Sequence, residues 1–221
     1  MAAASENVPT GRMVPPVPLG NEIPPEPPDV GARALLVASR LLAGASTFFF
    51  LAFLFTYFYL RSINQEHLWR PPHINPDQAL GAAMIACVIV SATLTTMGAR
   101  QMKGRSSSWL GPAIGGVGFG LAAVGLQCIE YTAQHFGPAD GAYASVFCAW
   151  TGLYLIAVLA TMYWLETQVA TELRARRSPV GSEGDIRDHD RLIAPGLDAA
   201  VFYWSFLAAI GLVTYVTLYL L

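Results

Sequence analysis

Five long stretches of this chain contain no Asp, Glu, Lys or Arg. An α-helix rises about 1.5 Å per residue, so about 20 apolar residues cross a hydrocarbon core of about 30 Å. Lipid offers no hydrogen-bond partners, and the stretches lack the alternation of barrel strands, so helices are expected. The sequence therefore predicts an all-α integral membrane bundle. Its five transmembrane helices fall at residues 41–60, 79–99, 109–129, 141–165 and 199–221.

The charged residues are confined to the segments between these stretches. Hydrophobic residues make up 54% of the chain and charged residues 13%, whereas a soluble domain carries about 25% charge. This composition excludes a soluble globular enzyme. We expect residues 33–221 to form the membrane domain, and residues 1–32 to form a cytoplasmic tail.

The tail is rich in proline, with eight prolines in residues 9–28. Such a segment favours extended polyproline conformation and buries no core of its own. It is either a disordered tail or a strap that becomes ordered on a partner subunit. It also lacks the basic start and short apolar core of a secretory signal peptide.

The distribution of Lys and Arg predicts the orientation of the helices. Eleven of the thirteen basic residues fall on the side of the N-terminus, and only Arg61 and Arg70 fall on the other. Basic residues stay cytoplasmic, so we expect the N-terminus inside and the C-terminus outside. A net charge of −2 gives no reason to expect nucleic-acid binding. The residues expected to meet lipid headgroups are Arg40, Arg100, Lys103 and Trp164.

Residues that carry chemistry are missing from the predicted helices. All four histidines lie outside them, although a haem held in a bundle needs axial ligands such as histidine. Proton and ion pathways need ionisable groups within the membrane, and the nearest are Glu130 and Asp140, at the ends of helices. We therefore predict no catalytic or cofactor-binding residue in this chain.

The outer side offers weak candidates for a metal site, namely His67, His73 and His135. Three imidazoles bind copper or zinc when folding brings them together. Their spacing matches no local ligand motif, however, and surface histidines in loops are the simpler interpretation.

The third predicted helix is suited to close contact with its neighbours. Its glycines include two pairs spaced four apart, a pattern that lets helix backbones approach closely. The members of these pairs are Gly111, Gly115, Gly116 and Gly120. Gln127 is expected to hydrogen-bond to a neighbouring helix, with Glu130 and Tyr131 as further contacts at the helix end. For Glu130 we expect an ion pair or a helix-end contact.

Four segments in order resemble the cytochrome c oxidase subunit III family. FFFLAFLFTYFYLR at residues 48–61 is similar to a core helix of that family, and GLQCIEY at 125–131 resembles its Gln and Glu-Tyr segment. DGAYASVFCAWTGLYLIAV at 140–158 follows its polar turn and Thr-Gly pattern. The last helix begins AVFYWSF and ends TLYLL, as the family's last helix does. The resemblance covers about residues 35–221, and a shorter bacterial form of the family has five helices.

The chain departs from the family's pattern at several polar positions. Ser46 or its neighbour stands where the family carries a glutamate. Tyr154 and Ala157 replace two histidines of the fourth helix, and Ser205 and Ala208 replace a histidine and an aspartate of the last helix. The chain therefore resembles a divergent member.

The resemblance implies an accessory, non-catalytic subunit of a haem–copper terminal oxidase in a bacterial plasma membrane. It implies packing beside a catalytic subunit I and a copper-bearing subunit II, which would hold the haem and copper, and it implies bound phospholipids. It also implies a supporting role in sustained proton uptake. Two alternatives remain open: a similar partner of a nitric oxide reductase or quinol oxidase, and a small metal-binding membrane protein or transporter.

Overall fold

The computed structural model describes residues 28–64, 69–71, 73–104, 108–177 and 183–221, and all regular structure within them is helical. The helices are α1 (Pro28–Ile63), α2 (Gln78–Lys103), α3 (Leu110–Ala133), α4 (Ala142–Arg177) and α5 (Glu183–Tyr215), and α5 continues into a short π-helix, η1 (Val216–Leu220). Five of them contain segments long and apolar enough to cross a membrane, which confirms the predicted fold class.

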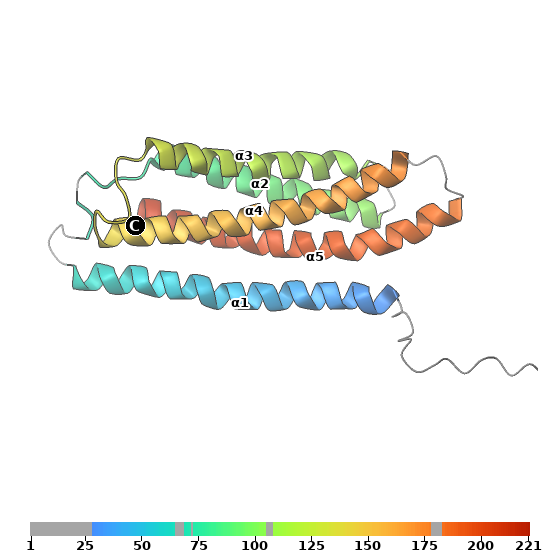
Figure 1. Cartoon of the computed structure of the whole chain (residues 1–221), viewed down its shortest axis with the longest axis horizontal. Helices are drawn as coiled ribbons and strands as arrows, with labels where there is room; N and C mark the ends of the chain where they lie inside the picture. Colours follow the sequence, from blue (N-terminus) through green and yellow to red (C-terminus); the bar gives the residue numbers. More distant parts are fainter. Residues whose placement is uncertain (1–27, 65–68, 72, 105–107, 178–182) are drawn as a thin grey trace, which may run out of the picture.

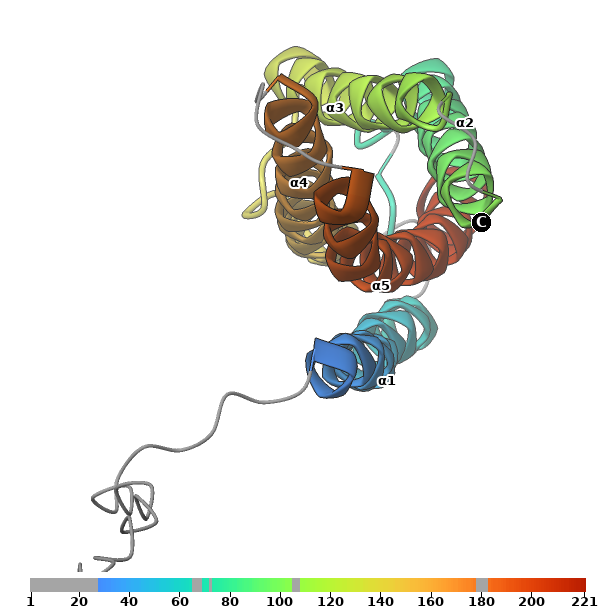
Figure 2. The ribbon, with the colours of Figure 1, turned by 90° about the vertical axis from the view of Figure 1, so that its right-hand side faces the viewer.

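Four helices enclose a common core. Viewed along the bundle, α2, α3, α4 and α5 follow one another around a ring (Figure 2). Large side chains fill the interior of the ring, among them Trp150, Trp204 and Phe147, which are at most 1% exposed. These aromatic side chains therefore make contacts between the four helices, where they are shielded from lipid.

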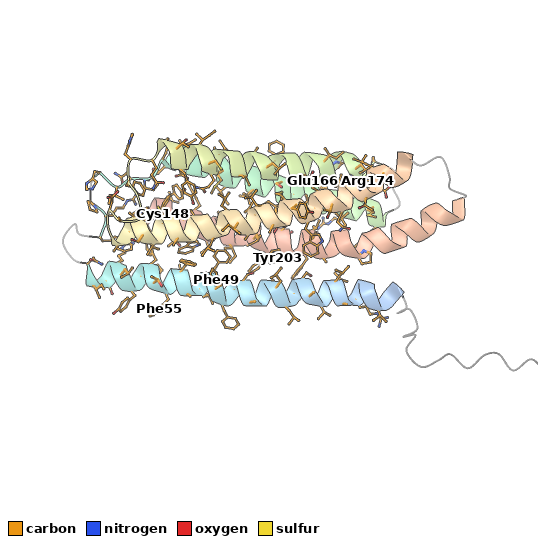
Figure 3. The ribbon with its side chains drawn as sticks, in the orientation of Figure 1. Phe49, Phe55, Cys148, Glu166, Arg174 and Tyr203 are labelled. Carbon is orange, nitrogen blue, oxygen red and sulfur yellow. The ribbon has the colours of Figure 1, made fainter. Side chains whose placement is uncertain are left out.

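The first helix lies outside this ring. α1 packs along α5 and makes a smaller contact with α4 (Figures 1 and 2). Phe50 contacts Tyr154, and Phe53 stacks on Trp150 with 5.9 Å between the ring centroids. The opposite face of α1 is uncovered in the isolated chain, and Figure 3 shows Phe55 pointing away from the bundle. The aromatic residues of α1 thus face both the bundle and its surroundings.

Local signals set some helix ends. The Asp77 side chain caps α2 by accepting hydrogen bonds from the backbone N–H groups of Ala79, at 2.8 Å, and Leu80, at 3.2 Å. Gly141, with φ of 150°, adopts a backbone conformation that side chains disfavour, directly before α4. The beginning of α1 and the C-terminus lie at opposite ends of the bundle, as five spans require (Figure 1).

Residues 166–198, which lie between the last two predicted transmembrane helices, are mostly helical where the structure describes them. α4 continues to Arg177 and α5 begins at Glu183. The absence of charge marks only the part of a helix that lies in hydrocarbon, whereas Glu, Leu, Arg and Ala are good helix formers in water too. The helices α4 and α5 therefore extend beyond the charge-free stretches.

Candidate functional site

A buried polar cluster joins three elements at the end of the bundle where the chain terminates. Gln127 and Glu130 lie one turn apart on α3, and they are 2% and 3% exposed. Gln127 Nε2 donates a hydrogen bond to Glu130 Oε2 over 2.8 Å, and the hydroxyl of Tyr219 donates to the same oxygen over 2.7 Å. Glu130 thereby ties α3 to η1.

Tyr219 is held in place from the other side by α2. Gln78 Nε2 donates to the backbone carbonyl of Tyr219 over 3.0 Å. The tyrosine ring lies directly against Gly81, where an added Cβ would stand 2.5 Å from Cε1 of the ring. The close approach therefore requires glycine at position 81, and the cluster spans α2, α3 and η1.

The cluster also contains acceptors without donors. Glu130 Oε1 and Gln127 Oε1 are buried, and neither accepts a hydrogen bond from any described residue. The ion pair of Lys103 with Asp198, at 2.9 Å, lies far from Glu130 in the described part of the chain. Glu130 therefore makes a helix-to-helix hydrogen bond rather than an ion pair. The expected bond from Gln127 to a neighbouring helix is wrong, because its partner is Glu130 on the same helix.

Tyr131 faces a different neighbour. Its hydroxyl donates to Thr151 Oγ1 over 2.7 Å, and the Thr151 hydroxyl donates to the carbonyl of Phe147 one turn earlier. This chain of hydrogen bonds connects α3 with α4. The adjacent residues Glu130 and Tyr131 thus serve two separate helix contacts.

The four glycines of α3 differ in their surroundings. Gly116 faces Ser91 and Thr95 of α2, and Gly120 faces Met162 of α4, with no room for a Cβ at either position. Gly115 approaches Leu94 at an ordinary distance. Gly111 has open space around it, so it makes no close helix contact within this chain.

Ser91 is the centre of a second buried polar contact. Its hydroxyl donates to the carbonyl of Gly116 over 2.5 Å and accepts from the indole N–H of Trp204 over 3.1 Å. This one side chain joins α2, α3 and α5. Sequence reasoning missed it, because an isolated serine in an apolar span has no distinguishing pattern.

The positions that depart from the family's pattern make ordinary packing contacts. Ser46 on α1 hydrogen-bonds to the hydroxyl of Tyr203 on α5 over 2.9 Å. The Tyr154 hydroxyl donates to the carbonyl of Leu207, and the Ser205 hydroxyl donates back to its own helix. The hydroxyl groups of Ser46 and Tyr154 thus connect helices, whereas that of Ser205 bonds within α5.

The candidate metal ligands do not form a cluster in the described part of the chain. His73 and His135 line one open pocket of about 360 Å³ beside Asp77 and Glu130. No group of three or more His, Cys, Asp or Glu among the described residues could hold a metal ion. His67 lies outside the described residues.

The candidate headgroup contacts lie toward the opposite end of the bundle, with Arg40 in the first half of α1. Arg40 and Arg100 are exposed, and Trp164 is partly buried on α4. Lys103 is exposed too, and its ammonium group pairs with Asp198 in the middle of α5. Figure 3 places Arg174 near this end and Cys148 near the other.

Comparison with known proteins identifies the family. The model of "Cytochrome c oxidase subunit III" matches residues 33–221. Similar relatives named cytochrome c oxidase subunit 3 include those of Tachyglossus aculeatus aculeatus, 25% identical over 79% of this chain and 65% of the relative, and Ornithorhynchus anatinus, 26% identical over the same shares. The protein of Latimeria chalumnae is 25% identical over 85% of this chain and 69% of its own length. This chain therefore spans about two thirds of the length of these relatives. Since the family model covers most of the chain, the protein belongs to the cytochrome c oxidase subunit III family.

Proposed function

We propose that this chain is a non-catalytic accessory subunit of a haem–copper terminal oxidase. Its family membership supports this role, and so does the chemistry of its buried polar groups. Glu130 and Ser91 are the two most connected of these groups, and both are engaged in contacts between helices. The observation that carries the proposal is therefore a bundle whose polar side chains hold helices together.

The partners that follow from this proposal are a catalytic subunit I and a copper-bearing subunit II, which would carry the haem and copper. The uncovered face of α1, with Phe48 78% and Phe55 71% exposed, offers apolar surface for lipid or for such a partner. We place the complex in a bacterial plasma membrane, where bound phospholipids and this chain would support assembly and sustained proton uptake.

Copurification tests the proposal. Membranes are solubilised mildly and purified through a tag on this chain, and we expect haem-containing and copper-containing subunits to be retained. The control is a tag on an unrelated five-span protein of the same membrane. Recovery of this chain without any haem protein would contradict an oxidase role.

A nitric oxide reductase or quinol oxidase is the second candidate, because the subunit III likeness concerns the fold and not the electron donor. The haem difference spectrum of the copurified complex separates these possibilities, together with its activity toward cytochrome c, quinol and nitric oxide. A metal-binding protein is the third candidate, supported only by the pocket beside His73 and His135. It requires stoichiometric metal in the isolated chain, lost when His67 and His73 are replaced.

A further inference from the structure

A pocket of about 360 Å³ lies where the beginning of α2 meets the end of α3. We call it the Glu130 pocket. Asp77 and Leu80 line it from α2, and Glu130 and Ala133 line it from α3. Pockets for small molecules measure about 300–1,000 Å³, so this one suits a compact ligand or a single inserted side chain.

Two residues that line the Glu130 pocket have a buried oxygen without a donor. Glu130 is 3% exposed, and its Oε2 already accepts hydrogen bonds from Gln127 and Tyr219. Its Oε1 accepts none from the described residues. Gln134 Nε2 donates to the carbonyl of Phe136 over 2.9 Å, and its Oε1 likewise has no donor in the described part of the chain. Since buried polar atoms are normally paired, both oxygens favour a ligand that donates hydrogen bonds.

The charge of the pocket points to a cation. Among the described residues its lining contains no lysine or arginine, whereas Asp77 lies exposed beside Glu130. Neither carboxyl group forms an ion pair with another described residue. Arg70 is engaged elsewhere, because it donates to Asn75 Oδ1 over 3.1 Å and lies over the ring of Tyr143. A positively charged ligand would therefore meet acidic groups without competition from a basic side chain of the lining.

The end of α3 adds to this preference. The last carbonyl groups of a helix lack partners within the helix, and the helix dipole is negative there. α3 ends at Ala133, which lines the pocket, and its last turn contains no basic residue. The opposite end of a dipole, at the beginning of α2, is already capped by Asp77. The helix ends around the pocket thus favour a cation too.

The lining groups do not converge on one point. Asp77, Glu130, His73 and His135 all line the pocket, but no group of three such residues in the described part of the chain could hold a metal ion. A guanidinium group differs from a metal ion because it is flat and carries five N–H donors that point in several directions. It therefore suits acceptors that are spread over the walls of a pocket.

We propose that the Glu130 pocket binds a guanidinium group, with N–H donors at Glu130 Oε1 and Gln134 Oε1 and its charge beside Asp77. A free small molecule or an arginine of a partner polypeptide supplies this chemistry, and the experiments separate the two sources. The inference goes beyond the accessory role, which requires no such site.

Isothermal titration calorimetry of the full chain in detergent tests the site with agmatine, a small guanidinium compound. We expect one agmatine per chain and no binding of tetramethylammonium, which has the charge but no N–H donor. Asp77→Asn should weaken agmatine binding about fivefold, because asparagine still caps α2 but lacks the charge. Asp140→Asn is the matched control, since it makes the same change at an exposed residue outside the pocket.

Three further variants test the carboxyl group and the space. Glu130→Gln keeps an oxygen for Tyr219 but offers an amide donor in place of Oε1, so binding should weaken about tenfold. Ala133→Phe fills the pocket and should abolish binding. Ala79→Phe is its control, since Ala79 is exposed on α2 outside the lining. The proposal is overturned if agmatine does not bind, or if the two controls lose as much affinity as their test variants.

The same titration of the purified complex identifies the source of the guanidinium group. Retained agmatine binding indicates a free ligand. Lost binding, with a crosslink from a photoreactive residue at position 133 to an arginine-containing segment, indicates a partner's side chain. Binding of zinc instead of agmatine would overturn the proposal in favour of a metal site. The titration of the chain alone needs no partner, so failure to copurify a haem protein would refute the oxidase role and leave this site intact.

Discussion

Single side chains decide how closely the helices of this bundle approach one another. The hydroxyl of Tyr219 reaches the carboxyl group of Glu130 only because Gly81 leaves room for the ring. In a membrane a buried polar group finds no water, so the bond and the missing Cβ act together. The sequence marked Gln127 and Glu130 as polar residues near a helix end. It could not reveal Tyr219 as their partner, because that contact depends on a π-helical turn 89 residues later in the chain.

Tyr219→Phe should lower the free energy of unfolding by about 1–2 kcal/mol, because Glu130 Oε2 loses its donor from η1 while the ring packing remains. Unfolding in mixed detergent micelles measures the change. Tyr215→Phe is the matched control, since Tyr215 stacks on Tyr219 and its hydroxyl forms no hydrogen bond with the described part of the chain. Equal losses in the two variants would show that the hydroxyl of Tyr219 contributes nothing specific.

Gly81→Ala should destabilise the chain by about 1–3 kcal/mol, because the new methyl group displaces the Tyr219 ring. Gly111→Ala serves as control, since nothing lies near its Cβ position. Alanine favours the helix over glycine by about 1 kcal/mol, so the control should be neutral or slightly stabilising. Thermal unfolding of both variants checks the difference, and a stable Gly81→Ala chain would contradict the close packing.

Whole helices follow from the sequence more directly than the contacts between them. The charge-free stretches located all five spans, because hydrocarbon excludes charge whatever the neighbouring helices are. The fourth predicted span ends at residue 165 and the fifth begins at residue 199, whereas α4 continues to Arg177 and α5 begins at Glu183. Outside the hydrocarbon core both helices and loops carry charged residues, so charge does not mark these helix ends. The glycine spacing in α3 pointed to close contact, but only the fold distinguishes Gly116, packed against α2, from Gly111, which faces open space.

At the level of elements, Ser91 is the point where α2, α3 and α5 meet. Ser91→Ala should cost about 1–3 kcal/mol of stability, because it leaves the Trp204 indole N–H buried without an acceptor. Trp204 fluorescence and thermal unfolding follow the change. Thr132→Ala is the control, since the Thr132 hydroxyl is exposed and bonds only within α3. An unchanged melting temperature for Ser91→Ala would show that the three helices do not depend on this contact.

The molecule as a whole has two chemically different ends. His73, His135 and Asp77 lie at one end, and Arg100 and Lys103 lie at the other. The excess of basic residues predicts that the second end faces the cytoplasm, together with the N-terminal tail.

Labelling with a membrane-impermeant maleimide tests this orientation. In a chain whose three cysteines are replaced by alanine, Ala139→Cys should react in intact cells and Ser5→Cys should react only after lysis. Ala139 is exposed in the turn before α4. Denatured samples control for the reactivity of each thiol, and the reverse pattern of labelling would invert the proposed topology.

The position of α1 outside the ring has a consequence for biosynthesis. The helices that cover α1 are α5 and α4, and its hydrogen bond from Ser46 reaches Tyr203, which is 157 residues further along the chain. At about 5–20 residues per second, a ribosome needs roughly 10–30 s to make that stretch. During this time α1 resides in the bilayer without the surface on which it will dock, so a nascent chain stalled before α5 should expose α1 to membrane quality-control proteases. The helix α5 thus both closes the ring of helices and anchors α1.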